Sequence, residues 1–267
     1  MLRERLRLGG WDVLDGATGS ELQALAAPSH LTEPATPRAV TLLTVAHGWL
    51  PDLERWVLSV FTHCKADFEA LVVDNSGDLR IAGWLKTRAA ERFRSIWIDP
   101  PLGFATAVNA GIEAATGDIV VVFDPGVELK GDAISPLIAA LGDPTVAVAG
   151  PYGVRGKGIL KEFEESAGPY VDAIEGYCMA FRRADALAIG GFDPKFRFYR
   201  IADIEFSFRL RDRGPGRALV VQGLPLLKHE HRLWEATEPA ERDRLSRRNL
   251  YRFLDRWGKR EDLLVGR

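Results

Sequence analysis

Cysteine is scarce in this chain: its 267 residues include only Cys64 and Cys178. Two thiols form neither a disulfide framework nor a zinc site with several cysteine ligands, so we expect both side chains to be buried as small apolar groups. Long apolar runs are missing too, since no stretch approaches the roughly 18 to 20 residues that cross a bilayer as a helix. The first residues, MLRERLRLGG, also lack the apolar core of a signal peptide. We therefore expect a cytoplasmic protein.

An excess of charge of one sign is also absent. The chain has 35 Lys and Arg against 37 Asp and Glu, a net charge of -2, which argues against general nucleic-acid binding. Two phosphate-binding motifs are missing, G-x-G-x-x-G after the first strand and G-x-x-x-x-G-K-[ST]. The Gly-rich piece Gly150 to Gly158 has no helix after it, so we expect a mobile loop there and not a phosphate cradle.

The sequence does contain a regular alternation of apolar strands and amphipathic helices from Ala39 to Ala149. β-Branched and aromatic runs favour strands, and apolar residues spaced by three and four positions favour helices. The pattern predicts strands at 39–46, 69–73, 95–98, 119–123 and 145–149, and helices at 52–64, 81–91, 104–116 and 133–141. This order is typical of a mostly parallel α/β sheet with right-handed crossovers and helices on both faces.

Polar loops follow three of these strands: Ala46-His47-Gly48, Asp74-Asn75-Ser76 and Asp124-Pro125-Gly126. The strand before Asp124 has four consecutive β-branched residues and a phenylalanine, as expected for a strand buried on both faces. Ligands of open α/β sheets bind beyond the carboxyl ends of the strands, so we expect a ligand site at this edge. Alternatively, Asp74 and Asp124 cap the helices that follow them.

The alternation breaks after Tyr170. The later part predicts strands within Val171 to Phe181, a helix at 202–213, a strand at 217–221 and a basic helix at 241–260. In that last helix Leu250, Leu254 and Trp257 lie on one stripe. At the other end, the proline-rich segment Ala27 to Pro37 predicts that residues 1–38 are an N-terminal extension and linker.

Five stretches together carry a family likeness. They are VVDNSGD (72–78), LGFATAVNAGI (102–112), FDPGVEL (123–129), EGYCMAFRRADALAIGGFD (175–193) and FYRIADIEFSFRLRDRG (198–214). They resemble family 2 inverting glycosyltransferases of the GT-A fold, with the bacterial rhamnosyltransferase-like enzymes as the closest subgroup. The resemblance implies a Rossmann-like sheet with a smaller mixed C-terminal part. It further implies a single domain at 39–267, with a nucleotide-binding half at 39–150, an acceptor half at 151–235 and a basic C-terminal helix at 236–267.

The resemblance implies a donor site at the carboxyl edge of the sheet. Asp74 would accept a hydrogen bond from the base N3–H of a nucleotide sugar, and Ala46 and His47 would line the base. Asn75 and Asn109 would belong to the same donor-binding set.

The resemblance also implies a divalent metal, Mn²⁺ or Mg²⁺. Asp124 matches the first acid of the family's D-x-D element, whose cation neutralises charge on the leaving diphosphate, and His229 or His231 lies where relatives place a late histidine ligand. The second acid is replaced by Gly126, and only Glu128 could substitute for it, which leaves metal use open. Read without the resemblance, the His229-Glu230-His231 triplet is a surface strand with both histidines on the same side.

Asp203 falls where the family keeps its catalytic base. There it would take the proton from the acceptor hydroxyl as that oxygen attacks the anomeric carbon from the face opposite the leaving group. The glutamate that usually precedes the base is Ala202. Glu205 would be the base if the register shifts by two residues, and is otherwise expected near the acceptor together with Tyr177. Asp203 could also simply cap the helix that begins at Ile204.

We therefore expect an inverting glycosyltransferase of the hexosyltransferase type, with a nucleotide-diphosphate sugar donor and a saccharide or lipid-linked acceptor, in cell-surface polysaccharide or glycoconjugate synthesis. The losses at Gly126 and Ala202 leave open a catalytically degenerate nucleotide-sugar-binding or scaffold protein on the same fold. A sugar-phosphate nucleotidylyltransferase is disfavoured because the first loop, AHGWLPDLER, is not Gly-rich. The arginines of 241–260 could contact anionic headgroups at the inner face of a membrane.

Overall fold

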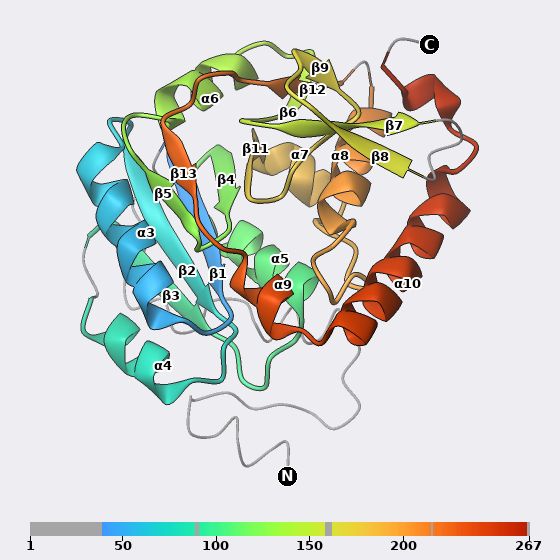
Figure 1. Cartoon of the computed structure of the whole chain (residues 1–267). Coiled ribbons are helices and arrows are strands. Elements are labelled where there is room, and N and C mark those ends of the chain that lie inside the picture. The colour runs from blue at the N-terminus through green and yellow to red at the C-terminus, as the bar shows by residue number, and fades with distance from the viewer. Residues whose placement is uncertain (1–38, 89–90, 158–161, 215, 266–267) are drawn as a thin grey trace.

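A computed structural model describes residues 39–88, 91–157, 162–214 and 216–265, so the predicted extension at 1–38 lies outside the described residues. An eight-stranded sheet crosses the molecule (Figure 1). In spatial order its strands are β3 (Phe93–Trp97), β2 (Phe68–Asp74), β1 (Val40–Ala46), β4 (Ile119–Phe123), β11 (Cys178–Arg182), β6 (Val146–Gly150), β12 (Arg217–Val220) and β9 (Tyr170–Val171). β3, β2, β1 and β4 are parallel neighbours, whereas β11 runs antiparallel between β4 and β6. The expected mostly parallel α/β sheet is confirmed.

Helices cover both faces of this sheet, because the strands are apolar on both sides. One face carries α3 (Leu50–His63), α4 (Leu79–Lys86) and α6 (Ile134–Leu141), and the other carries α5 (Phe104–Ala114), α7 (Arg183–Ala188) and α8 (Ala202–Asp212). Alternate residues of one strand enter different clusters: Leu42 packs with Trp56 of α3, and Leu43 packs with α5. No helix among the described residues is both long and apolar enough to span a bilayer.

The second half of the chain adds smaller elements outside the large sheet. They are the sheet of β10 (Ala173–Ile174), β7 (Gly153–Lys157) and β8 (Glu162–Ser166), the pair β13 (Leu226–Lys228) and β5 (Val127–Leu129), the helices α9 (Arg232–Ala236) and α10 (Pro239–Trp257), and the short helix η1 (Glu261–Leu263). The expectation of a mobile loop at 150–158 is wrong, because β7 pairs with both β8 and β10. At Gly153 of β7 the neighbouring strand packs closely, because a Cβ there would lie 2.5 Å from the Ala173 carbonyl oxygen.

The turn from α5 into β4 depends on Gly117. A Cβ at this residue would lie 2.4 Å from the backbone nitrogen of Thr41, and the Gly117 N–H donates to Thr41 Oγ1 at 2.9 Å. This contact fixes the start of β4 beside the start of β1, where Val40 faces Ile119. The parallel register then carries the strands to a common edge, with Ala46 directly opposite Asp74.

Candidate active site

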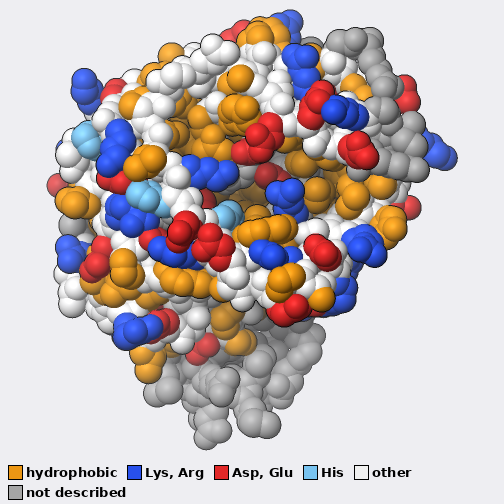
Figure 2. All heavy atoms as spheres, in the orientation of Figure 1, with side chains coloured by type: hydrophobic (Ala, Val, Ile, Leu, Met, Phe, Trp, Pro, Cys, Tyr) orange, Lys and Arg blue, Asp and Glu red, His pale blue; other side chains and the backbone are white. Residues whose placement is uncertain are grey.

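A cavity of about 530 Å³ lies beyond this carboxyl edge and is lined by both halves of the chain. Its lining includes His47, Trp49, Asp52 and Asp124 from the first half, and Glu175, Tyr177, Tyr199, Arg200, Asp203, His231 and Trp234 from the second. Figure 2 shows this side of the molecule hollowed, with hydrophobic side chains in the hollow and charged ones around it. The convergence of titratable groups on one concave space makes it the candidate active site.

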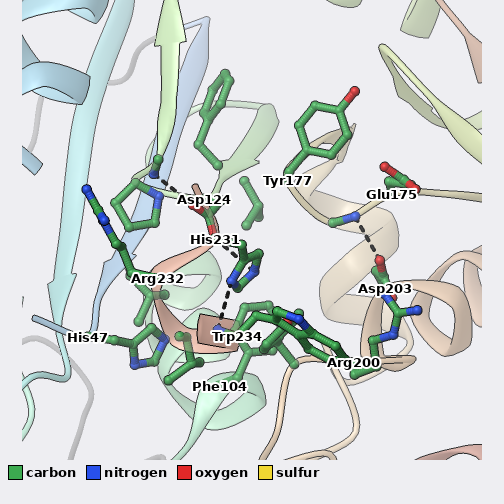
Figure 3. A pocket seen from close by; sticks show the side chains of 18 of the residues that line it. His47, Phe104, Asp124, Glu175, Tyr177, Arg200, Asp203, His231, Arg232 and Trp234 are labelled. Atoms are coloured by element: carbon green, nitrogen blue, oxygen red, sulfur yellow. Dashed lines mark hydrogen bonds and ion pairs between the residues drawn. The ribbon is translucent and has the colours of Figure 1, made fainter. Parts of the chain in front are cut away.

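Asp124 and His231 lie side by side in the cavity (Figure 3). Asp124 Oδ2 lies 3.2 Å from His231 Nε2, and Asp124 Oδ1 accepts the Gly126 N–H at 2.7 Å. His231 Nδ1 accepts the Trp234 N–H at 3.3 Å, so Nε2 carries the imidazole proton and donates it to Asp124. The helix-cap alternative for Asp124 is wrong, because strand β5 follows it.

A side chain at position 126 would crowd Asp124. A Cβ there would lie 2.9 Å from Asp124 Oδ1 and 3.1 Å from the carbonyl oxygen of Glu230, so the replacement of the second acid comes with close packing of the chain around Asp124. Glu128, the substitute considered from the sequence, lies on β5 and accepts from Lys130 and pairs with His229, at 2.6 and 2.9 Å. The structure therefore does not bring Glu128 or His229 to the cavity.

The predicted same-side orientation of His229 and His231 is wrong. The strand β13 ends at Lys228, so the alternation of a strand no longer applies to the triplet. His231 instead caps α9 and stacks on Tyr199, with ring centroids 4.2 Å apart. Among the described residues no group of three or more His, Cys, Asp or Glu is arranged to hold a metal, so Asp124 and His231 are a pair of candidate ligands and not a complete shell.

Asp203 lies at the start of α8, on the opposite wall from Asp124 (Figure 3). Oδ2 accepts the Gly176 N–H at 2.8 Å and Oδ1 accepts the N–H of Ile204 at 2.9 Å. Burial raises the pKa of this carboxyl, and the two backbone donors and Arg200 only partly oppose that effect. The side chain thus keeps contact with the cavity while its pKa lies above the ordinary range of aspartate.

Two residues next to these side chains have strained backbones. Trp49 and Ile201 have φ of 55° and 71°, the left-handed region that side chains other than glycine rarely adopt. Each directly precedes a helix, α3 or α8, and each lines the cavity. Such strain tends to persist at functional sites, where the surrounding structure holds it in place.

Helix α9 crosses the cavity and is anchored on both sides. Arg232 Nε donates to the buried Asp52 at 3.0 Å, which connects α9 to the first turn of α3. Trp234 lies between two guanidinium groups, with Arg200 at 5.5 Å and Arg242 at 4.5 Å from its ring centroid. These contacts place the His231 side chain over Asp124.

His47 lines the cavity on the other side of Asp124. Its Nε2 is buried without a partner among the described residues. Burial, and secondarily the nearby His231, lower the pKa of His47 to about 4. The imidazole is therefore neutral at pH 7 and has one ring nitrogen available for a ligand.

The other predicted donor residues lie behind the cavity wall. Asp74 is fully buried; its Oδ1 accepts from the Ser76 N–H and hydroxyl, and its Oδ2 has no partner among the described side chains and backbone. The helix-cap alternative for Asp74 is wrong, because Asp78 caps α4. The pKa of Asp74 is raised by burial. The residue paired with Asp74 across the strands, Ala46, is also fully buried.

Asn75 and Asn109 connect backbone segments and do not line this cavity. The Asn75 side chain accepts the N–H of Leu102 at 2.9 Å. The Asn109 side chain makes two hydrogen bonds to the backbone of Phe192, at 2.8 and 2.7 Å. Both asparagines therefore hold backbone segments behind the cavity wall, and their donor-binding role stays a prediction.

Glu205 points away from the cavity, towards α10. Its Oε1 lies 3.1 Å from Arg256 and 3.8 Å from Arg209, and burial raises its pKa to about 7. Tyr177, by contrast, lines the cavity as expected for an acceptor residue, and its backbone carbonyl accepts the Asp124 N–H. The structure thus brings only one of the two predicted acceptor residues to the site.

Several cavity residues were not predicted. Trp49, Asp52, Glu175, Arg200, Arg232 and Trp234 all line it. Two of them had a signal in the sequence: Arg200 lies just before the Asp203 element and Arg232 just after the histidine triplet. The remaining four come together through contacts between segments that are distant in the chain, which no local pattern indicates.

Residues 41–205 match the model of glycosyl transferase family 2. The chain belongs to this family. The match extends from β1 through the segment that ends on Asp203 and Glu205, so it includes Asp124 and Asp203, whereas His231 lies beyond it. The glycosyltransferase assignment made from the sequence is confirmed, and the rhamnosyltransferase-like subgroup stays a prediction. No curated protein matches this family 2 glycosyltransferase in sequence.

Solved glycosyltransferase structures share the fold. A structure of GalNAc-T7 with UDP, GalNAc and Mn²⁺ covers 84% of the chain with a TM-score of 0.66 at 16% identity. The mannosyltransferase PcManGT from Pyrobaculum calidifontis, with GDP-Man and Mn²⁺, covers 83% at a TM-score of 0.54 and 19% identity, and S. aureus TarS covers 82% at 0.54 and 17%. The chain spans 49%, 61% and 43% of these proteins, and at such identities the likeness concerns the fold alone.

Proposed function

We propose that this family 2 glycosyltransferase transfers a sugar from a nucleotide-diphosphate donor to an acceptor hydroxyl with inversion, and that Asp203 is the catalytic base. One observation carries the proposal: the same cavity has the Asp203 carboxylate on one wall and the Asp124–His231 pair on the other. A base on one side and a diphosphate site on the other is the geometry that direct displacement needs. The donor belongs at the sheet edge and the acceptor beside α8.

Asp203 has the surroundings expected of a general base. Its pKa is raised by burial, which increases its basicity, while the N–H groups of Gly176 and Ile204 hold the carboxylate in place. In the reaction the acceptor hydroxyl passes its proton to Asp203. The hydroxyl oxygen bonds to the anomeric carbon as the bond from that carbon to the diphosphate breaks.

Asp124 and His231 fit a divalent cation that keeps other ligands. Neighbouring ligands in an octahedral shell with bonds of about 2.1 Å lie about 3 Å apart, and the two side-chain atoms are 3.2 Å apart. A cation there would replace the proton on His231 Nε2 and take its remaining ligands from water and diphosphate. When bound, it would neutralise charge on the leaving diphosphate. The Mn²⁺ in the structures of GalNAc-T7 and PcManGT supports this assignment.

The donor's nucleoside would lie between His47 and Trp49. His47 offers a neutral ring with an unpartnered Nε2, and Trp49 offers an indole that is 38% exposed at the cavity. Asp74 is the predicted partner of the nucleotide base, and the nucleotide base would have to pass the loop at 46–48 to reach it. The neighbours named with UDP and with GDP-Man support a nucleotide-diphosphate donor but differ in the base.

A thermal-shift panel of UDP, dTDP, GDP, CDP and ADP, each with and without Mn²⁺, tests the donor site. A ligand at a hundredfold excess over its dissociation constant stabilises the folded state by about 2.7 kcal/mol. We expect one nucleotide to raise the melting temperature, and Mn²⁺ to enlarge that shift in the wild type but not in Asp124→Asn. A panel with no shift at all would contradict the proposal.

A second function follows from Gly126 and Ala202, which replace two acids of the family pattern. A catalytically degenerate protein would bind a nucleotide sugar without turning it over. Steady hydrolysis or transfer of the donor that gives the thermal shift would exclude this alternative. Binding of that donor without any turnover, across a range of acceptors, would favour it over the enzyme.

We also infer that α10 contacts an anionic membrane during glycoconjugate synthesis. Arg244, Arg247 and Tyr251 are exposed on this helix, and Arg247 and Tyr251 are four residues apart on one face. Co-sedimentation with vesicles containing phosphatidylserine, compared with phosphatidylcholine alone, measures this contact. Equal sedimentation with both would contradict it.

A further inference from the structure

The wall of the cavity beyond Asp203 carries polar and charged side chains that have no role in the proposed transfer step. Glu175 and Tyr177 come from the loop between β10 and β11, Glu165 from β8, and Lys228 from the end of β13. Figure 3 shows Glu175 and Asp203 on the same side of the cavity, with Tyr177 above them. An acceptor whose hydroxyl reaches Asp203 has to lie against this wall.

Glu175 lies close to the catalytic base Asp203, but its carboxylate has few hydrogen-bond partners among the described residues. Gly176, the next residue, donates its N–H to Asp203. The Glu175 carboxylate is 23% exposed, and among the described residues it pairs with Lys228, at 3.8 Å. Burial raises the pKa of Glu175; Lys228 opposes this, and Asp203 and Glu165 add to it. A ligand hydroxyl donating to Glu175 would supply the hydrogen bond that the protein does not.

The strand β8 places a second carboxylate and an aromatic ring at the mouth of the cavity. Phe163 and Glu165 both line it, as residues two apart on one strand face should. Glu164 lies on the other face and pairs with Lys157 at 2.8 Å. Among the described residues Glu165 has no hydrogen bond or ion pair of its side chain, so its oxygens are available to a ligand.

This wall disfavours a negatively charged ligand. Glu165, Glu175 and Asp203 bring three carboxylates to it. Two cations lie near them: Arg200, whose charge acts on both Asp203 and Glu175, and Lys228. The charge of Lys228 is already shared with Glu175 and with the ring of Tyr177, 4.3 Å from the ammonium nitrogen, so the three carboxylates still outnumber the cations. A phosphate placed here would meet net negative charge in a partly desolvated space, where repulsion is stronger than in water.

An apolar surface adjoins these carboxylates. Val154, Phe163, Ile204 and Leu250 line the cavity, and three of them belong to, or pack against, the apolar cluster that joins α8 and α10. Val154 and Ile204 are only 8% and 7% exposed, so the surface is continuous with the core. Apolar side chains of this kind pack against an apolar group and offer nothing to a hydroxyl.

We propose that this wall is an acceptor subsite for a neutral glycoside, in which Glu175 and Glu165 accept hydrogen bonds from ring hydroxyls and the surface of Phe163, Ile204 and Leu250 receives an apolar aglycone. The proposal rests on the proposed function, since it places the acceptor relative to Asp203. It narrows the acceptor to a hydroxyl-rich sugar with an attached apolar group, and it excludes a phosphate at the ring that receives the new sugar.

Saturation-transfer NMR on the full chain tests the subsite without knowledge of the natural acceptor. The probes are the methyl and 4-nitrophenyl glycosides of glucose, galactose and mannose, and the 6-phosphates of the same sugars. We expect a 4-nitrophenyl glycoside to bind more tightly than its methyl counterpart, and the sugar phosphates to bind at least tenfold more weakly. No binding by any glycoside, or stronger binding by a sugar phosphate, would overturn the proposal.

Single substitutions connect this binding to the named residues. Loss of a hydrogen bond to a charged group raises the dissociation constant about tenfold or more. We expect such a rise for Glu175→Gln and for Glu165→Gln. Glu164→Gln, on the opposite face of β8, is the matched control and should bind as the wild type does. Because Glu165 is exposed and its side chain has no hydrogen bond or ion pair to another described residue, its variant reports on binding even if Glu175→Gln folds poorly.

The nucleotide thermal-shift panel separates failure of the subsite from failure of the proposed function. A normal nucleotide shift with glycoside binding that is unchanged in both glutamate variants overturns the subsite alone. Absence of any nucleotide shift, with glycoside binding that depends on Glu175, would remove the donor site and keep the subsite. Leu250→Ala should reduce the preference for the 4-nitrophenyl over the methyl glycoside, and an unchanged preference would contradict the apolar part.

Discussion

The two halves of the molecule build the cavity in different ways. In the first half, residues 40–150, the cavity residues follow the carboxyl ends of parallel strands, so the register of β1, β2 and β4 determines where His47 and Asp124 lie. In the second half they come from a loop, a helix start and the segment around α9, which long-range contacts hold in place. Each half has one strained residue at the cavity, Trp49 or Ile201. The comparison teaches that the sheet fixes His47 and Asp124, whereas contacts between distant segments of the second half fix Asp203 and His231.

The largest expected effect tests whether the catalytic base lies in the second half of the chain. Asp203→Asn should lower kcat by about 10²- to 10⁴-fold, because the acceptor hydroxyl loses its base, while nucleotide affinity stays unchanged. Transfer assays and calorimetry on the same samples measure the two quantities. Asp212→Asn, at the far end of α8 where Asp212 pairs with Arg260 at 2.7 Å, is the control. Loss of nucleotide binding in Asp203→Asn would assign Asp203 to the donor wall instead.

The second prediction asks how much the acceptor wall depends on α10. Asn249 is fully buried and its Nδ2 donates to the carbonyl oxygens of Phe198 and Arg200, each at 2.9 Å. Asn249→Ala should lower the free energy of unfolding by about 2 kcal/mol, since two buried acceptors lose their donor. It should also reduce kcat, because Tyr199 and Arg200 lose their support. Urea unfolding and transfer assays measure both.

The control for Asn249 lies on the same helix. Tyr251 is 64% exposed, and Tyr251→Ala should leave stability within about 0.5 kcal/mol of the wild type. If Asn249→Ala unfolds more easily but keeps full kcat and KM, α10 supports the fold only, and the acceptor wall does not depend on it.

A third prediction concerns position 126, where the family pattern has an acid and this chain has glycine. Gly126→Ala places a Cβ 2.9 Å from Asp124 Oδ1 and should displace that carboxylate. We expect apparent Mn²⁺ affinity, measured by the metal-dependent part of the nucleotide thermal shift, to fall by about tenfold, as for other residues that orient metal ligands. Gly83→Ala is the control, since its Cβ would meet nothing within 4 Å. A stronger metal effect in Gly126→Ala would show that the site accommodates a side chain there.

The last prediction concerns Glu205, whose pKa is raised by burial to about 7 in the folded protein. Between its unfolded pKa and pH 7 the folded state then binds more protons than the unfolded state, so this residue makes stability decrease as pH rises through that window, by at most about 1.4 kcal/mol per unit. Glu205→Gln should remove its part of the slope in urea unfolding between pH 4.5 and about 7.5. An unchanged slope would show that Arg256 and Arg209 already offset the burial of the carboxylate.

The parallel part of the fold could be predicted from the sequence because its signals are local. Four β-branched residues before Phe123 indicate a doubly buried strand, and the polar loops after three strands indicate the ligand edge. The predictions failed where a pairing partner decides the structure. Gly150 to Gly158 reads as a loop, yet β7 finds partners in β8 and β10. The histidine triplet reads as a strand, yet β13 ends before it.

The candidate site shows the same division. Asp124, His231, Asp203 and Tyr177 were predicted and line the cavity, while Asp74, Asn109, His229 and Glu205 were predicted and lie behind or away from it. A motif gives the type of a residue at a position but not the direction of its side chain. Glu205 illustrates this: two residues after Asp203 on a helix, it points to Arg256 and not to the cavity.

The sequence by itself determined the α/β class, the order of the main helices and strands up to Ala149, the edge of the sheet where the cavity lies and the family, since these depend on periodicity, turn chemistry and motif spacing. Only the tertiary structure decided which of two histidines faces Asp124, that a side chain at position 126 would crowd that carboxylate, and that Glu165 and Glu175 meet beside Asp203. The reason is physical: these arrangements depend on contacts between segments tens to more than a hundred residues apart, and no local pattern records which segments will pack together.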